Sequence, residues 1–279
     1  MAYGWQGLVL ATWVALSVGS FLNVVIYRFP IMLQREWETQ AREVLELPDV
    51  PQEERFNLSV PRSKCPKCGH QIRFYENIPL LSWLALRGKC SNCGSAISWR
   101  YPGVEALTAI LTLVVLAEFG FTAFGIAACL LTWSLVALTF IDYDTKLLPD
   151  QITLPLLWVG LLTHAFLGGP LALTDAILGA VAGYLFLWLT YWGFKLITGK
   201  EGMGYGDFKL LGALGAWLGW MALPAIILLS AVSGLLYAIS QFALRRQTKS
   251  EPIPFGPFLA FAGWVTLCFR DSVLGLFSI

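Results

Sequence analysis

Long apolar stretches separated by short polar breaks run through most of the chain. A helix that crosses a bilayer needs about 20 apolar residues, and eight stretches come near this length. The breaks contain residues that end helices, as at Gly168-Gly169-Pro170 and Pro224. The stretches run approximately over Trp5–Tyr27, Val104–Phe119, Ala123–Ile141, Ile152–Leu167, Ala172–Ile197, Phe208–Leu223, Ile226–Leu244 and Pro257–Phe269. This pattern predicts an all-α polytopic membrane protein with about eight transmembrane helices, although the short stretches allow a count one lower or higher.

The composition agrees with this prediction, because 57% of the residues are hydrophobic and only 13% are charged. The first stretch is too long for the apolar part of a signal peptide and lacks a small-residue cleavage site, so we expect a retained helix. The formal net charge is +1, and the basic residues of the one long polar loop are balanced by acids. We therefore expect membrane lipid around the protein and no nucleic-acid partner.

The positions of Lys and Arg predict how the chain is oriented, because these residues concentrate on the cytoplasmic side of membrane proteins. With the N-terminus outside and eight helices, every Lys and Arg except Arg270 lies on the cytoplasmic side. A seven-helix arrangement would scramble this distribution. The long polar loop should therefore face the cytoplasm.

The chain divides into a first transmembrane helix over 1–28, a polar cytoplasmic loop over 29–102 and a multi-helix membrane domain over 103–279. Apolar residues at helical spacing predict a separate amphipathic helix over Met32–Leu47. Packing against the membrane surface and packing against the neighbouring subdomain both remain open for this helix. Glu105 enters an apolar stretch, where an unpaired charge is expensive, so we expect it to pair with Arg100 or Arg28.

Two Cys-x-x-Cys pairs in the polar loop predict a metal site. Each pair is followed by glycine, and such a turn directs two thiolates to one point, so two turns complete a tetrahedral site for Zn²⁺. Two disulfides are the alternative, but a cytoplasmic loop keeps its thiols reduced. Four thiolates leave no open position for water, so the zinc would be structural, and His70 is near enough to compete as a ligand. The four predicted ligands are Cys65, Cys68, Cys90 and Cys93.

Acidic residues stand at the ends of two apolar stretches, where a buried carboxylate indicates function. Asp142, Asp144 and Asp150 belong to one cluster, and Asp207 follows a glycine-rich turn. Two carboxylates brought close cannot both ionise cheaply, so one keeps its proton and the pair supplies an acid and a base. Aspartic proteases use such a pair to attack an amide with water. From the residues alone, a second function remains open, that of a transporter in which these acids bind a cation or relay protons.

Taken together, the motifs resemble those of the bacterial type IV prepilin leader peptidases, bifunctional enzymes of pilus assembly and type II secretion. The resemblance covers nearly the whole chain. It rests on Val18–Val25, the two Cys-x-x-Cys pairs, Glu76-Asn77-Ile78-Pro79, Arg100-Tyr101-Pro102, Ile141–Asp150, Gly202–Lys209 and Ile253–Pro257.

This resemblance implies an aspartic endopeptidase of the bacterial inner membrane. Such an enzyme removes the short basic leader of type IV prepilins and pseudopilins after a glycine. It then N-methylates the new N-terminal residue with S-adenosylmethionine. The resemblance assigns Asp142 and Asp207 as the catalytic pair, and it implies accessory roles for Asp144, Asp150, Gly204, Gly206 and Lys209.

The site of methyl transfer is the least defined part of the sequence. No glycine-rich loop of a nucleotide-binding fold is present, and the segment that contains the cysteines is too short to hold one. By elimination and by resemblance, we place methyl transfer near that segment, with Glu76, Gly88 and Lys89 as candidates. A segment that only docks other pilus assembly proteins is the alternative.

Overall fold

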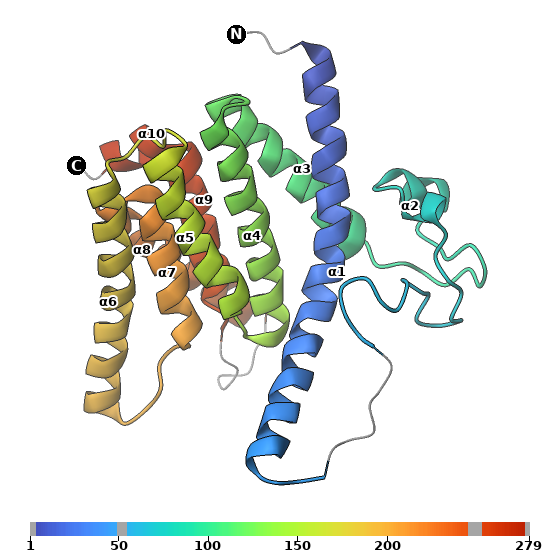
Figure 1. Cartoon of the computed structure of the whole chain (residues 1–279), viewed down its shortest axis with the longest axis horizontal. Helices are drawn as coiled ribbons and strands as arrows, with labels where there is room; N and C mark the ends of the chain where they lie inside the picture. Colours follow the sequence, from blue (N-terminus) through green and yellow to red (C-terminus); the bar gives the residue numbers. More distant parts are fainter. Residues whose placement is uncertain (1–3, 49–54, 245–252, 277–279) are drawn as a thin grey trace. The chain divides into compact units, whose positions relative to one another are not determined.

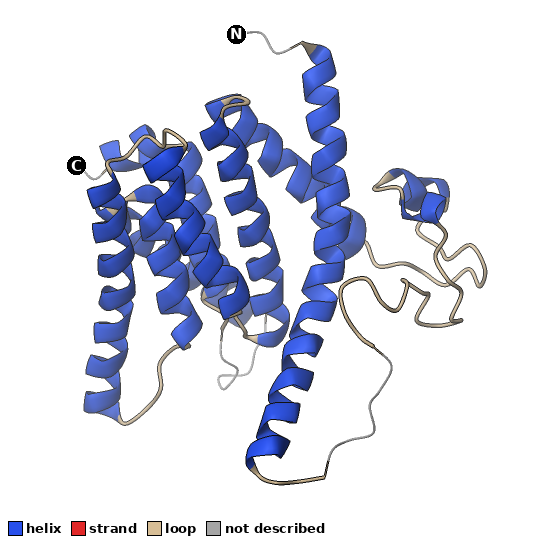
Figure 2. Cartoon of the chain, viewed as in Figure 1, coloured by secondary structure: helices blue, strands red, loops and turns tan. Residues whose placement is uncertain are grey.

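The computed structural model describes residues 4–48, 55–244 and 253–276. Helices joined by loops make up the described chain, and none of its residues lies in a β-strand (Figure 2). The all-α prediction is therefore confirmed. The helices are α1 (Trp5–Val44), η1 (Phe74–Asn77), α2 (Leu81–Ala85), α3 (Arg100–Phe119), α4 (Ala123–Thr145), α5 (Asp150–Phe166), α6 (Leu173–Thr198), α7 (Tyr205–Leu218), η2 (Trp220–Ala222), α8 (Leu223–Ala243), α9 (Gly256–Cys268) and α10 (Arg270–Gly275).

All eight apolar stretches contain a helix, and five helical segments of the described chain are long and apolar enough to cross a membrane. They are α1, α3, α4, α6 and the segment Trp220–Ala243. The remaining helices are shorter. At about 1.5 Å per residue, the 14 residues of α7 span roughly 21 Å, less than the roughly 30 Å of a bilayer core.

The structure corrects the predicted boundary after the first apolar stretch. Instead of a break followed by a separate amphipathic helix, α1 continues for 40 residues and includes Pro30. Proline removes one backbone hydrogen bond of a helix, but Arg28, Met32 and Leu33 near it are good helix formers, and the helix continues through it. Beyond Pro30, Leu33 is buried, whereas Trp37 and Val44 are exposed.

The chain forms two compact units, Met1–Leu113 and Val114–Ile279. In the first unit, α1 and the start of α3 touch backbone to backbone, because a Cβ on Gly19 would lie 2.7 Å from the Cα of Glu105. The Glu105 carboxylate accepts a hydrogen bond of 2.8 Å from the N–H of Leu80. Arg28, one of its two expected partners, donates instead to the carbonyl oxygens of Asn57 and Pro61. These bonds tie the polar loop to both helices.

In the second unit, α7 lies in the core, packed against α5, α6 and α9 (Figure 1). Every residue of α7 from Asp207 to Leu218 except Lys209 is buried. Its approach to α6 is so close that a Cβ on Gly179 would lie 2.2 Å from the carbonyl oxygen of Gly215. Small residues allow such backbone contact between membrane helices, and here they fix the helix that carries Asp207.

Two polar side chains complete the carboxyl end of α7. The last carbonyl groups of a helix have no partner within it, and in apolar surroundings they need one. The His164 Nε2 lies 3.0 Å from the carbonyl oxygen of Trp217, and the Arg270 guanidinium donates to that of Leu218 at 2.8 Å. Arg270 is the one basic residue that the predicted orientation places outside the cytoplasm. Its bond to the carbonyl oxygen of Leu218 gives it a structural role.

We expect Arg270→Met to lower the thermal unfolding temperature of the purified protein in detergent. The substitution leaves a buried carbonyl without its charged donor, a loss of about 1.5–3 kcal/mol. Lys200→Met, which removes an exposed cation in the same unit, is the matched control and should leave the unfolding temperature unchanged. Equal unfolding temperatures for both variants would show that the Arg270 bond is not needed.

Candidate active site and metal centre

The cysteines of the polar loop form two turns with the same backbone hydrogen bonds. In the first, the N–H of Cys65 donates to the carbonyl of His70, and the N–H of Gly69 donates to the carbonyl of Cys65. Gly69 has a φ of 71°, a left-handed conformation that favours glycine. A short antiparallel bridge between Lys64 and Gln71 closes this turn.

The second turn repeats these features. The N–H of Cys90 donates to the carbonyl of Ser95, the N–H of Gly94 donates to the carbonyl of Cys90, and Gly94 has a φ of 68°. Lys89 and Ala96 form the closing bridge.

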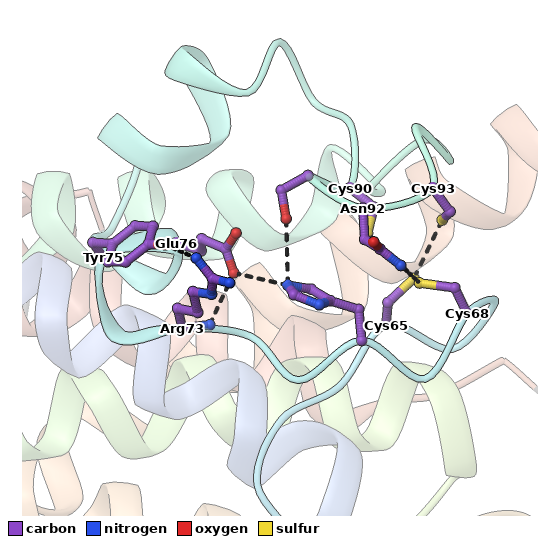
Figure 3. A network of polar contacts seen from close by, with 10 residues as sticks. Cys65, Cys68, Arg73, Tyr75, Glu76, Cys90, Asn92 and Cys93 are labelled. Carbon is purple, nitrogen blue, oxygen red and sulfur yellow. Dashed lines mark hydrogen bonds and ion pairs between the residues drawn. The ribbon is translucent and has the colours of Figure 1, made fainter.

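The two turns bring four sulfurs to one point (Figure 3). The Sγ atoms all lie within 4.8 Å of one another, and those of Cys65 and Cys93, like those of Cys68 and Cys90, are 3.9 Å apart. A tetrahedral Zn²⁺ with Zn–S bonds of about 2.3 Å places its sulfurs about 3.8 Å apart. A disulfide needs about 2.0 Å, and all four cysteines are free. The donor set and its spacing therefore fit Zn²⁺.

Hydrogen bonds to Cys65 and Cys93 favour the thiolate form that a metal requires, whereas burial and the neighbouring thiols raise the pKa of Cys68. The N–H groups of Cys68 and Lys67 lower the pKa of Cys65 to about 6. The hydroxyl of Ser95 lowers the pKa of Cys93. His70 is not a member of the four-ligand cluster, and its Nε2 lies 3.4 Å from the Glu76 carboxylate.

Beside the cysteines lies an open cavity of about 450 Å³. Glu76 reaches it with a carboxylate that accepts a hydrogen bond of 2.9 Å from the N–H of Arg73. The hydroxyl of Ser91 and this N–H lower the pKa of Glu76, so its side chain is charged at neutral pH. The lining residues are His70, Arg73, Tyr75, Glu76, Ser82, Ala85, Leu86, Ser91 and Asn92.

Gly88 and Lys89, the other two methyl-transfer candidates, are not among the residues that line this cavity. Gly88 has a φ of 66°, and a Cβ on it would lie 2.9 Å from the ring of Trp83. Its carbonyl accepts a hydrogen bond from the N–H of Ile97. Gly88 therefore makes the turn between α2 and the second cysteine pair, a conformational role.

The second unit buries both predicted catalytic aspartates. Asp142 lies in the last turn of α4 and Asp207 in the first turn of α7, with exposed fractions of 5% and 6%. They are near enough for the charge of Asp142 to act on Asp207. The N–H of Gly256 donates to Asp142 Oδ2 at 3.0 Å, whereas Asp207 Oδ1 is buried with no partner in the described chain. This arrangement can hold an acid and a base side by side.

The glycines beside Asp207 have different surroundings. A Cβ on Gly206 would lie 2.6 Å from the Cβ of Leu148, so no larger residue fits there. At Gly204 the nearest contact of a Cβ would be Asp207 Oδ2 at 3.8 Å, an ordinary van der Waals distance. Leu148 is half-buried and touches the backbone that leads to Asp207.

The predicted accessory residues Asp150 and Lys209 form an ion pair. Lys209 Nζ lies 2.7 and 2.6 Å from the two carboxylate oxygens of Asp150. This pair joins the start of α5 to the first turn of α7, two residues beyond Asp207. Asp144 lies one half-turn past Asp142 at the exposed end of α4.

Further residues near the aspartates, for which no role was predicted, make contacts in the structure. Gly256 contacts Asp142 although the two residues are 114 positions apart. The sequence signal for it was the Ile253–Pro257 motif, to which no role was assigned. Near the other aspartate, Lys195 at the end of α6 contacts Glu201 at 2.8 Å, which holds the loop before Gly204. The ring of Tyr191 packs on that of Tyr205 at the start of α7.

Two protein-family models match the chain. The model of the Bacterial Peptidase A24 N-terminal domain matches residues 13–119, and that of the Type IV leader peptidase family matches residues 129–239. No solved structure matches the chain.

Three curated relatives are named prepilin leader peptidase/N-methyltransferase. The protein of Aeromonas salmonicida is 59% identical over 93% of this chain and 89% of its own length. That of Stutzerimonas stutzeri is 57% identical and that of Pseudomonas aeruginosa 54% identical, each over 92% of this chain and 89% of its own length. The chain therefore belongs to the type IV leader peptidase family.

Proposed function

We propose that this chain cleaves the leader from type IV prepilins and pseudopilins after a glycine, and then methylates the new N-terminal residue with S-adenosylmethionine. The observation that carries the proposal is the burial of Asp142 and Asp207 at neighbouring helix ends. The relatives are similar to this chain over nearly its full length, and their names support both activities.

In the proposed cleavage, one carboxylate of the pair is charged and the other is protonated. The charged member takes a proton from water while the water oxygen attacks the carbonyl carbon of the scissile peptide bond. The protonated member donates to the developing oxyanion. When the intermediate collapses, the C–N bond breaks, and the leaving amine takes the proton that the charged member had received from water. A transporter would use the same acids for a cation, but the family and the names of the relatives favour hydrolysis.

The distribution of Lys and Arg supports a bacterial inner-membrane protein whose polar loop and catalytic pair face the cytoplasm. Within it we assign residues 29–102 to the zinc-binding segment and 103–279 to the peptidase domain. Residues 1–28 form the first transmembrane part of α1, which continues past this boundary. A prepilin can then keep its apolar helix in the membrane while its leader reaches the acids.

The cavity beside the cysteines is the proposed site of methyl transfer. S-adenosylmethionine, when bound, supplies the methyl group, and it combines a sulfonium cation with an amino acid that carries both charges. The charged Glu76 matches the cationic groups, and the Arg73 guanidinium lines the same cavity and matches a carboxylate. Four thiolates would hold Zn²⁺ in a structural role and fix the turns that carry His70 and Ser91.

Incubating the purified protein with a prepilin and labelled S-adenosylmethionine tests both activities. We expect a shortened pilin by mass spectrometry and label on its new N-terminus. A shortened pilin without label would support the alternative that the zinc-binding segment only docks other proteins. An unchanged prepilin would refute the peptidase.

We expect Glu76→Gln to lower methyl transfer to a pre-cleaved pilin by roughly 10- to 100-fold. The variant keeps the shape of the side chain but removes the charge that faces the cation, a loss of about 1.5–3 kcal/mol. Prepilin cleavage should stay at the wild-type rate. Glu43→Gln, which neutralises an exposed glutamate of α1, is the control. Equal methyl transfer by both variants would remove Glu76 from the site.

A further inference from the structure

We propose that Gly256 is a positioning residue for peptide cleavage, because its N–H holds one oxygen of Asp142 and its lack of a side chain leaves room for that carboxylate. This inference rests on the proposed peptidase function. It concerns the first residue of α9, which lies in the Ile253–Pro257 motif but has no role assigned to it by the resemblance or by the names of the relatives.

The hydrogen bond joins two buried groups. The N–H of Gly256 lies 3.0 Å from Asp142 Oδ2, and Asp142 is only 5% exposed. Gly256 is the first residue of α9, so its N–H is one of those that have no acceptor within the helix. A helix begins with partial positive charge, and a hydrogen bond to a carboxylate is among the stronger kinds.

The space around Gly256 explains why it must be glycine. A Cβ there would lie 2.8 Å from Asp142 Oδ2, a distance at which one of the two groups has to move. The same Cβ would lie 3.0 and 3.1 Å from the Cδ atoms of Leu148. Pro257, which follows, has a fixed φ that suits the first turn of a helix and limits how far this loop can adjust.

The bond determines which oxygen of Asp142 is available. With Oδ2 bound to Gly256, Oδ1 is left to act on the substrate. The reaction needs the two carboxylates and the scissile bond in one geometry, and a displacement of about 1 Å can lower a rate about 100-fold. A methyl group at position 256 should therefore lower the rate of the chemical step.

Gly256→Ala tests the proposal in the full-length protein with a prepilin substrate. We expect kcat for cleavage to fall about 100-fold, with KM within about threefold of wild type, because the change acts on a catalytic group. Methyl transfer to a pre-cleaved pilin should be unchanged, and an unfolding temperature in detergent close to that of wild type shows that the variant is folded. Gly193→Ala is the matched control, because a Cβ on this α6 glycine meets nothing within 4 Å.

A second comparison separates the effect on Asp142 from simple crowding against Leu148. Leu148→Ala removes the crowded side chain, so a crowding defect would disappear in the variant with both substitutions. We expect the double variant to stay about 100-fold below the Leu148→Ala variant. If Gly256→Ala alone does not fold, the comparison of the double variant with Leu148→Ala still tests the proposal.

Wild-type kcat in Gly256→Ala, or full recovery in the double variant, would overturn the role of Gly256. The proposed peptidase function fails in a different way, because the wild-type protein would then not cleave a prepilin.

Discussion

Replacing either Asp142 or Asp207 by Asn is expected to lower prepilin cleavage by several orders of magnitude. Asparagine keeps the shape of the side chain and most of its hydrogen bonds but cannot share a proton with the other acid. Both residues are buried, and the water that attacks the peptide bond needs one of them as its base and the other as an acid. Initial rates of leader removal, followed by mass spectrometry, measure the loss.

The effects of the two substitutions on the cleavage rate should not be additive. Groups that act as one unit fail together, so the variant with both changes should be hardly slower than either single one. Both single variants should still methylate a pre-cleaved pilin. Asp271→Asn makes the same replacement of Asp by Asn in α10, away from the pair, and is the control. If either single variant cleaved at near the wild-type rate, the pair would be wrongly assigned, and Asp144 or Asp150 would be the next candidate.

The sequence could predict features that depend on spacing along the chain. The apolar stretches are long and bounded by glycine and proline, so each of the eight contains a helix. The cysteine turns depend only on neighbouring residues, and the structure places all four sulfurs within 4.8 Å of one another. The glycine-rich turn before Asp207 and the apolar stretch after it likewise predicted a helix start there, and Asp207 lies in the first turn of α7.

Features that depend on contacts between distant residues could not be read from the sequence. The bond from Gly256 to Asp142 joins residues 114 positions apart. Arg270 looked like an exception to the charge distribution until its bond to the end of α7 explained it. The apolar pattern predicted one helix ending near Tyr27 and another over Met32–Leu47, yet α1 runs through both as one helix that includes Pro30.

The second large effect is expected from removing the metal. If four cysteines hold one Zn²⁺, the purified protein should contain about one equivalent, and Cys65→Ser/Cys90→Ser should lose it. The polar loop has little else to keep it folded. Between residues 57 and 99, only Cys65, Pro79 and Gly88 are buried, so this segment has no apolar core, and segments of this kind depend on a metal or disulfides.

Zinc loss should therefore loosen residues 57–100 and open the cavity that contains Glu76, so methyl transfer should fall far more than cleavage. Metal analysis, limited proteolysis and the two activity assays measure these effects on one preparation. Cys129→Ala removes a buried cysteine of α4 outside the cluster and should keep both the metal and methyl transfer. The assignment would be wrong if freshly prepared protein contained the four cysteines as disulfides. A zinc-free variant that still methylated a pre-cleaved pilin at the wild-type rate would instead place methyl transfer outside the segment, because the cavity walls are held by the same two turns as the metal.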